Sequence, residues 1–170
     1  MAKIEYIVVH HTATPRYWTT VQLRDLHVNE RGWRDIGYHY VIRQVLGEVL
    51  VEEGRPQDGD DHLEPWEYGA HVQGSNARSL GICVVGNFSK EKMPPMLKAY
   101  LLLTLYKLCK KHDLDPMCAI RGHREMPKAS TECPGTKVDM TDVRAAVKTI
   151  TLILDGIDRF NSIDLLLEET

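Results

Sequence analysis

Hydrophobic and polar positions follow two different periods along this chain, and each change of period marks an expected element. Residues 3–11 form a short β-branched run, which predicts a buried strand that ends at His10 and His11. Further strands are expected as a pair around a turn near Gly47 within residues 37–55, as a buried run over 79–88 and as a short run over 118–123. Residues 54–79 are rich in Gly, Asp, Pro and Asn and predict a long irregular crossing, the kind of loop that often carries function.

Helical spacing marks three other segments. Residues 19–32 open with Thr19 and Gln22 at capping-box spacing. Two prolines open residues 94–112, whose basic residues cluster in the last turn, where they suit the helix dipole. Apolar residues recur every three or four positions in residues 142–154. Strands and helices in this mixture predict an α/β fold, with a mixed central β-sheet flanked by helices.

The length of the chain predicts a single domain. It has 170 residues, 43% of them hydrophobic, which is enough for one compact core. We assign residues 1–154 to this domain and 155–170 to a C-terminal amphipathic tail. Gly156 predicts a break in the helix, followed by a second helical segment. We expect this segment to dock on the domain, with a partner or dimer contact as the alternative, through the apolar residues Ile157, Phe160, Ile163 and Leu166.

Charge and composition narrow the possible partners. The net charge is -3 and the pI about 6.2, so the chain lacks the basic surface expected of a nucleic-acid-binding protein. The N-terminal apolar run is short and interrupted by Glu5, which predicts neither a signal peptide nor a membrane span and favours synthesis in the cytoplasm. Four cysteines in a chain of this size are expected to be reduced. The sequence leaves the oligomeric state open.

Two expected strands end in a histidine, and a cysteine follows in a nearby loop. His10 and His123 lie at strand ends, where α/β sheets place ligands, and Cys133 follows ten residues after His123. Each residue alone is also typical of a satisfied polar group or a small buried thiol, and the spacing is not a compact zinc motif. Residue patterns alone therefore leave open whether Cys133 is a buried thiol, half of a disulfide or a metal ligand. His11 should face the opposite side of its strand and belong to the core or support the site.

Four ordered blocks of sequence carry a resemblance to a known family. They read IVVHHTAT, GWRDIGYHYVIRQVLGEVLVEEGR, GAHVQGSNARSLGICVVGN and RGHRE followed by STECPG. Together, from about Ile4 to about Val147, they resemble the zinc-dependent N-acetylmuramoyl-L-alanine amidases, which include phage lysozyme amidases and peptidoglycan recognition proteins. The resemblance implies a Zn²⁺ ion bound by His10, His123 and Cys133, with the fourth position open to water. It also implies hydrolysis of the amide between the lactyl group of N-acetylmuramic acid and L-alanine in peptidoglycan or muropeptides.

The resemblance implies roles for four further residues. Tyr38 would hold the attacking water or donate to the developing oxyanion. Thr131 stands where phage members often have a lysine, so that a neutral donor replaces a cation. His71 and Asn76 correspond to the substrate cleft, and His71 could instead brace its loop. Lys128 is more typical of an exposed loop lysine, although it could also reach the site.

Two other functions stay open at the level of sequence. A peptidoglycan-binding protein without catalysis would have the same fold, but members without activity commonly replace the cysteine that is Cys133 here. A structural zinc protein requires a fourth ligand, for which His27, His39, His62, His71 and His112 are candidates. A phage endolysin, a wall-recycling enzyme and an effector would all have the same site.

Overall fold

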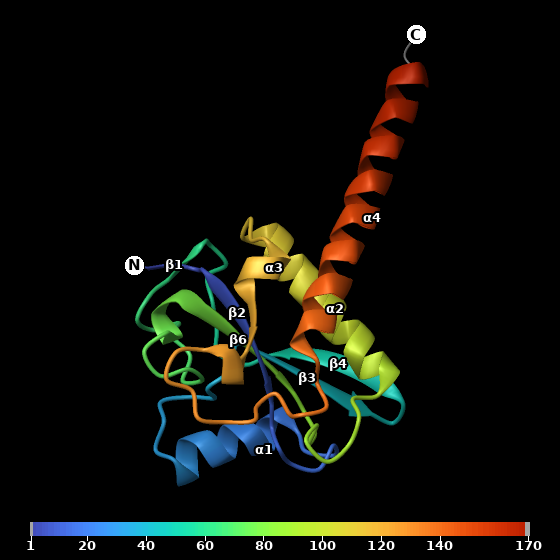
Figure 1. Cartoon of the computed structure of the whole chain (residues 1–170). Coiled ribbons are helices and arrows are strands. Elements are labelled where there is room, and N and C mark those ends of the chain that lie inside the picture. The colour runs from blue at the N-terminus through green and yellow to red at the C-terminus, as the bar shows by residue number, and fades with distance from the viewer. Residues whose placement is uncertain (1, 169–170) are drawn as a thin grey trace.

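The computed structural model describes the backbone of residues 2–168 and the side chains of residues 2–160. Its centre is a five-stranded mixed sheet in the order β4-β3-β6-β2-β7 (Figure 1). Neighbouring strands in this sheet run parallel, except for the antiparallel pair β3 and β4. The strands are β2 (Tyr6–His11), β3 (Tyr40–Val45), β4 (Glu48–Glu53), β6 (Ser79–Val84) and β7 (Ile120–Gly122). The predicted α/β fold with a mixed sheet is confirmed.

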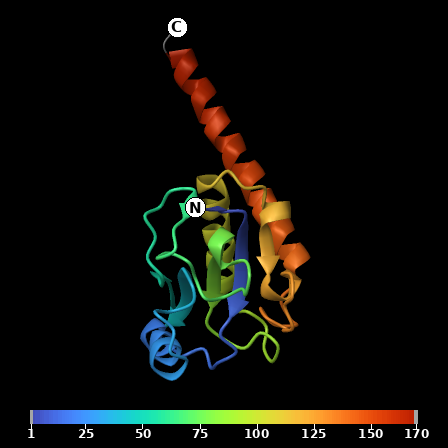
Figure 2. The same ribbon diagram turned by 90° about the vertical axis from the view of Figure 1, so that its left-hand side faces the viewer.

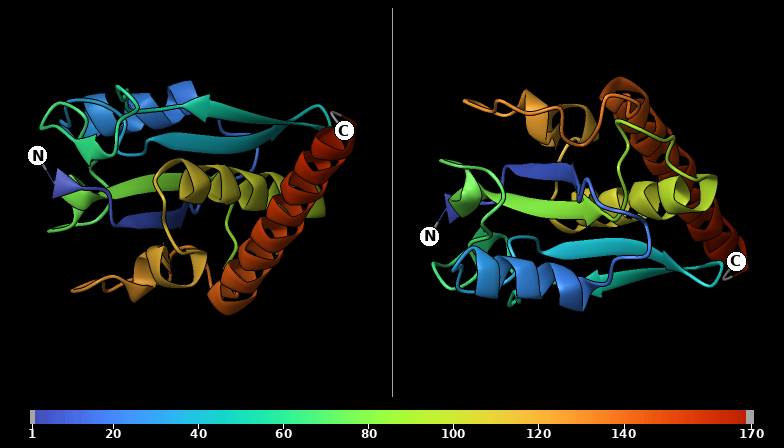
Figure 3. Two further views of the ribbon diagram at one scale, coloured as in Figure 1. Left: turned by 90° about the horizontal axis from the view of Figure 1, so that it is seen from above. Right: turned by 90° about the horizontal axis from the view of Figure 1, so that it is seen from below.

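Helices cover the sheet unequally on its two faces (Figures 2 and 3). On one face, α2 (Pro95–Lys111) and the first turns of α4 (Met140–Glu168) bury a continuous apolar core with alternate residues of the strands. On the other face, α1 (Thr20–Asp25) and the helical turn η1 (Leu26–Glu30) pack beside β3. Long loops cover the rest of this second face, and the His10 side chain points toward these loops.

Most predicted elements are present, with small differences at their ends. The capping box of Thr19 and Gln22 opens α1, as predicted. A short helix, α3 (Pro116–Ala119), takes the first residues of the expected strand over 118–123 because Asp115 caps it and Pro116 opens it. The expected crossing over residues 54–79 contains the short β5 (His62–Leu63), paired with β1 (Ala2–Lys3), and the turn η2 (Asn76–Arg78). All four cysteines are free thiols.

The helix α4 differs from the prediction at Gly156. It runs without a break to Glu168, so the predicted break is wrong. A glycine costs only about 1 kcal/mol in a helix interior, and neighbouring residues with good propensity offset this cost. Figure 1 shows that the helix extends well beyond the sheet, and Ile157 and Phe160 are 49% and 65% exposed. The side chains of Ile163 and Leu166 lie outside the described residues, and the division into domain and docked tail stays a prediction.

Within residues 2–168, no helix combines the length and the apolar character needed to cross a membrane.

Candidate metal centre and active site

The strand order brings the two predicted histidine ligands together. β2 and β7 are adjacent and parallel, with Val9 opposite Gly122, so the next residues, His10 and His123, meet at the same edge of the sheet. Their ring centroids lie 4.7 Å apart. The loop that follows β7 returns to this edge and places the Cys133 Sγ 3.6 Å from the His10 Nδ1. One donor atom from each of these three residues lies within 4.8 Å of the other two.

This donor set fits a zinc ion. Bond lengths of about 2.0 Å to nitrogen and 2.3 Å to sulfur at a tetrahedral angle separate the two ligand atoms by about 3.5 Å, close to the distance between His10 and Cys133. Two imidazoles and a thiolate are ligands that zinc prefers. Within residues 2–160, no fourth His, Cys, Asp or Glu joins the cluster. A three-ligand set of this kind matches a catalytic zinc site and not a closed structural one.

His11 supports the cluster from the other side of the strand. Its Nδ1 accepts a hydrogen bond from the Phe88 backbone N–H at 3.0 Å, so its ring points away from the three donors, as predicted. Its backbone N–H approaches the Cys133 Sγ at 3.4 Å. An N–H donor at this position favours the thiolate form of the sulfur.

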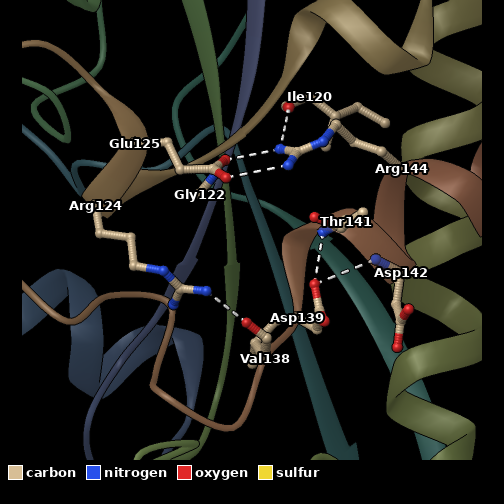
Figure 4. A network of polar contacts seen from close by, with 9 residues as sticks. All are labelled: Ile120, Gly122, Arg124, Glu125, Val138, Asp139, Thr141, Asp142 and Arg144. Carbon is tan, nitrogen blue, oxygen red and sulfur yellow. Dashed lines mark hydrogen bonds and ion pairs between the residues drawn. The ribbon is translucent and has the colours of Figure 1, made fainter.

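Polar contacts of Arg124 hold the cysteine loop, and Figure 4 shows the one with Val138. The Arg124 guanidinium donates to the backbone carbonyls of Gly135 at 2.9 Å, Val138 at 2.6 Å and Glu132 at 3.3 Å. The Arg124 backbone N–H donates to the Cys133 carbonyl at 2.8 Å. The segment that carries His123 is thus tied directly to the loop that carries Cys133.

Glu125 ties the same segment to the sheet and to α4. Its carboxylate accepts from the Gly122 backbone N–H at 2.8 Å and forms an ion pair with Arg144 at 2.8 Å. Figure 4 shows the carboxylate between these two partners. The turn η3 (His123–Glu125), which carries a predicted ligand, is therefore anchored on both of its sides.

Burial sets the protonation states of the three donors. It holds the pKa of His10 well below its usual value, and the neighbouring His71 and His123 lower this pKa further. Burial also lowers the pKa of His123. Both imidazoles are therefore neutral at pH 7, as metal ligands must be. Burial raises the pKa of the Cys133 thiol to about 11, so metal binding must displace its proton.

A cavity of about 440 Å³ opens beside the cluster. It brings together four residues that sequence analysis assigned to the site, His71, Asn76, His123 and Thr131, and it also includes Lys128. The Thr131 Oγ1 accepts a hydrogen bond from the Cys133 backbone N–H at 3.1 Å. The Thr131 hydroxyl can therefore keep its own proton available to a ligand in the cavity.

Tyr38 lies against the cluster, with its ring centroid 5.2 Å from that of His10. Its hydroxyl lies near the Cys83 thiol. Burial raises the pKa of Tyr38 well above its usual value, and the neighbouring thiols of Cys83 and Cys133 raise it further. The phenol therefore stays protonated at neutral pH and can act as a donor.

His71 and Asn76 use their polar atoms within the protein. The His71 Nδ1 lies 3.0 Å from the His10 Nε2. The Asn76 Oδ1 accepts from the backbone N–H groups of His71 at 3.0 Å and Val72 at 2.9 Å. Both residues line the cavity, and their predicted contact with substrate stays a prediction.

Several residues beside the cluster were not predicted from the sequence. Arg124 and Glu125 directly follow His123 in the RGHRE block, so their position beside a candidate ligand was the available signal. Cys83 and the cavity residue Trp33 carried no such signal, because only the sheet order and the loop path bring them to the site.

Comparisons with known proteins agree with this geometry. A sequence model of the family described as N-acetylmuramoyl-L-alanine amidase matches residues 1–136. The chain is 32% identical over 143 residues to peptidoglycan-recognition protein LB of Drosophila melanogaster, across 78% of this chain and 55% of the relative. It is 33% identical over 138 residues to the endolysin of Enterobacteria phage K11, across 78% of this chain and 76% of the relative.

A solved structure extends the similarity to the fold. N-acetylmuramoyl-L-alanine amidase LysC from Clostridium intestinale URNW matches with a TM-score of 0.69 and 29% identity, over 85% of each chain. The family match covers the whole sheet and all three clustered donors. This chain therefore belongs to the N-acetylmuramoyl-L-alanine amidase family.

Proposed function

We propose that this protein is a zinc-dependent amidase that hydrolyses the bond between the lactyl group of N-acetylmuramic acid and L-alanine in bacterial peptidoglycan. The observation that carries this proposal is the cluster of His10, His123 and Cys133 at the edge of a cavity. Three protein donors leave a coordination position for water and substrate. The relatives named as an endolysin and as an amidase favour the cell wall as the substrate.

The residues around the cluster would have different roles in amide hydrolysis. Zinc would supply Lewis acidity, which activates water as a nucleophile at neutral pH and polarises the scissile carbonyl. The Tyr38 ring lies beside that of His10, and its protonated hydroxyl would donate to the oxygen that becomes negatively charged, or orient the water. Thr131, held by its contact with the Cys133 backbone, supplies a second, neutral donor from the cavity wall.

The cavity provides room for the substrate next to the donors. Its wall combines backbone and side chains of the loop over residues 70–76 with those of the loop over 127–131. Trp33 also lines the cavity and offers an aromatic surface against which apolar parts of a peptide or sugar can pack. We propose that the peptide stem lies between these two loops, with the scissile amide directed at the cluster.

The direct test is hydrolysis of purified sacculi. We expect the zinc-loaded protein to release peptides with new L-alanine N-termini, identified by mass spectrometry. Treatment with a chelator should abolish this release, and added zinc should restore it. Cys133→Ser should bind zinc much more weakly and lose hydrolysis, whereas Cys118→Ser, which changes an exposed thiol outside the cluster, should behave as wild type.

The same experiment separates the second candidate function. A peptidoglycan-binding protein without catalysis would sediment with the sacculi and release no peptide, with or without zinc. Full hydrolysis by the Cys133→Ser variant would contradict the proposed metal site.

A further inference from the structure

A line of hydrogen bonds leads from a buried carbonyl of β6 to the predicted ligand His10. The Ser79 backbone carbonyl lies 3.2 Å from the His71 Nε2. At the other end of the same imidazole, the His71 Nδ1 lies 3.0 Å from the His10 Nε2. The His10 Nδ1 then faces the Cys133 Sγ at 3.6 Å. Both histidines are buried, so water does not compete for these contacts.

The direction of every hydrogen bond in this line follows from its first member. A carbonyl oxygen can only accept, so the His71 Nε2 must carry a proton. A neutral imidazole has one proton, and the His71 Nδ1 is therefore an acceptor. The His10 Nε2 must then donate, which leaves the His10 Nδ1 without a proton and with its lone pair directed toward the cluster. The opposite tautomer of His71 would place two acceptors, or two donors, against each other.

We propose that His71 is a positioning residue that selects the metal-binding tautomer of His10 and fixes the orientation of its ring before the metal arrives. This inference rests on the proposed metal site and gives His71 a role other than contact with substrate. Imidazole ligands commonly donate their second N–H to an acceptor, and loss of that acceptor typically weakens metal binding about 10- to 100-fold.

The surroundings of His71 hold its ring in one place. A Cβ on Gly81 of β6 would lie 2.7 Å from the His71 Cγ, and a Cβ on Gly69 would lie 2.5 Å from its Cδ2. Because both positions are glycine, the His71 ring fits between them, and a side chain at either position would displace it. The ring meets that of His10 edge-on, with an interplanar angle of 89°. Asn76 fixes the backbone of the same residue through its contact with the His71 N–H.

His39 is also a buried imidazole and makes no hydrogen bond to the three donors, although its ring meets that of His71 edge-on, with centroids 5.6 Å apart. The Gly81 backbone N–H donates to the His39 Nδ1 at 2.8 Å, and the His39 Nε2 lies 3.1 Å from the Glu67 carbonyl. Like His71, it has a partner at each ring nitrogen, but both partners are backbone groups and neither belongs to a predicted ligand. It therefore provides a control for the loss of a buried hydrogen bond beside His71.

Two substitutions at position 71 separate the acceptor from the rest of the side chain. In His71→Asn, the amide oxygen can occupy the place of Nδ1 and still accept from His10. In His71→Gln, the longer side chain can still donate to the Ser79 carbonyl but offers no acceptor at the Nδ1 position. Zinc affinity is measured by competition with a chromophoric chelator, and the melting temperature of the metal-free protein is measured in parallel.

We expect His71→Gln to bind zinc about 10- to 100-fold more weakly than wild type, and His71→Asn to stay within about threefold. His39→Gln should lower the melting temperature of the metal-free protein and leave zinc affinity unchanged. Wild-type zinc affinity in His71→Gln would overturn the proposal. Equal losses in His71→Gln and His71→Asn would overturn it too, since they would indicate packing and not the acceptor.

The tautomers can also be observed without any substitution. In protein with ¹⁵N-labelled histidine, long-range NMR couplings report which ring nitrogen carries the proton. We expect a proton on Nε2 of both His10 and His71, in the metal-free and in the zinc-loaded protein. A proton on the His71 Nδ1 would refute the proposal. Neither measurement uses hydrolysis, so a protein that shows these tautomers but does not cleave peptidoglycan would contradict only the proposed function.

Discussion

Replacing Arg124 with methionine should loosen the loop that carries Cys133 while leaving the core intact. The guanidinium donates to the backbone carbonyls of Glu132, Gly135 and Val138, which flank the cysteine on both sides. Figure 4 shows the contact with Val138. Methionine keeps much of the aliphatic stem but none of the donors. The variant therefore tests how far this network prepares the third predicted zinc ligand.

The expected magnitude follows from the carbonyls that lose a donor. Glu132 is exposed, so its carbonyl regains water, whereas Gly135 and Val138 are buried. A hydrogen bond from a charged group contributes at least about 1.5 kcal/mol, so two such contacts contribute about 3 kcal/mol. If they form only when the cysteine loop is ordered, zinc affinity should fall about 100-fold.

Competition with a chromophoric chelator measures this loss, and the melting temperature of the metal-free protein reports global stability. Arg55→Met is the matched control, because the buried Arg55 also donates to two backbone carbonyls, those of Ile36 and Asp35, away from the three donors. It should lower the melting temperature without changing zinc affinity. If Arg124→Met binds zinc within about threefold of wild type, the Arg124 contacts do not prepare the Cys133 loop for zinc and contribute only to general stability.

Four further outcomes are expected. Tyr38→Phe should lower kcat on peptidoglycan about 100-fold with little change in KM or melting temperature. An unchanged kcat would show that Tyr38 serves only in packing. Thr131→Ala should cause a smaller loss that Thr131→Ser restores; equal activity of all three proteins would exclude a donor role. Burial lowers the pKa of His27 from about 6.5 to about 4, so folding favours its neutral form. The resulting contribution to the free energy of unfolding, up to about 3 kcal/mol, is complete above pH 6.5 and is lost as the pH falls toward 4. Urea titrations of the metal-free protein should therefore show a shallower loss in that window for His27→Asn, which can still accept from the Gly37 N–H; parallel curves would be inconsistent with this assignment. Truncation after Leu154 should leave zinc affinity and chelator sensitivity unchanged, because the three donors lie far earlier in the chain; a loss of zinc would show that the tail supports the site.

Local patterns predicted those parts of the site that depend on single elements. The β-branched run over residues 3–11 places His10 near the end of a strand, and period 2 turns His11 to the other face. The capping box of Thr19 and Gln22 is likewise a local interaction and is present as predicted. Gly156 shows the limit of this approach, because a weak helix former does not end a helix whose other residues continue it.

The sequence by itself determined the mixed α/β fold, the histidines at the ends of two strands and, through ordered blocks, the resemblance to the family. Only the tertiary structure decided that β7 lies beside β2, so that His123 meets His10, and that the following loop returns Cys133 to the same place. It also decided which nitrogen of His10 meets His71, and which carbonyls Arg124 holds. The physical reason is that these contacts join segments far apart in the chain, and their geometry depends on strand order, loop path and burial, none of which a local pattern of residues encodes.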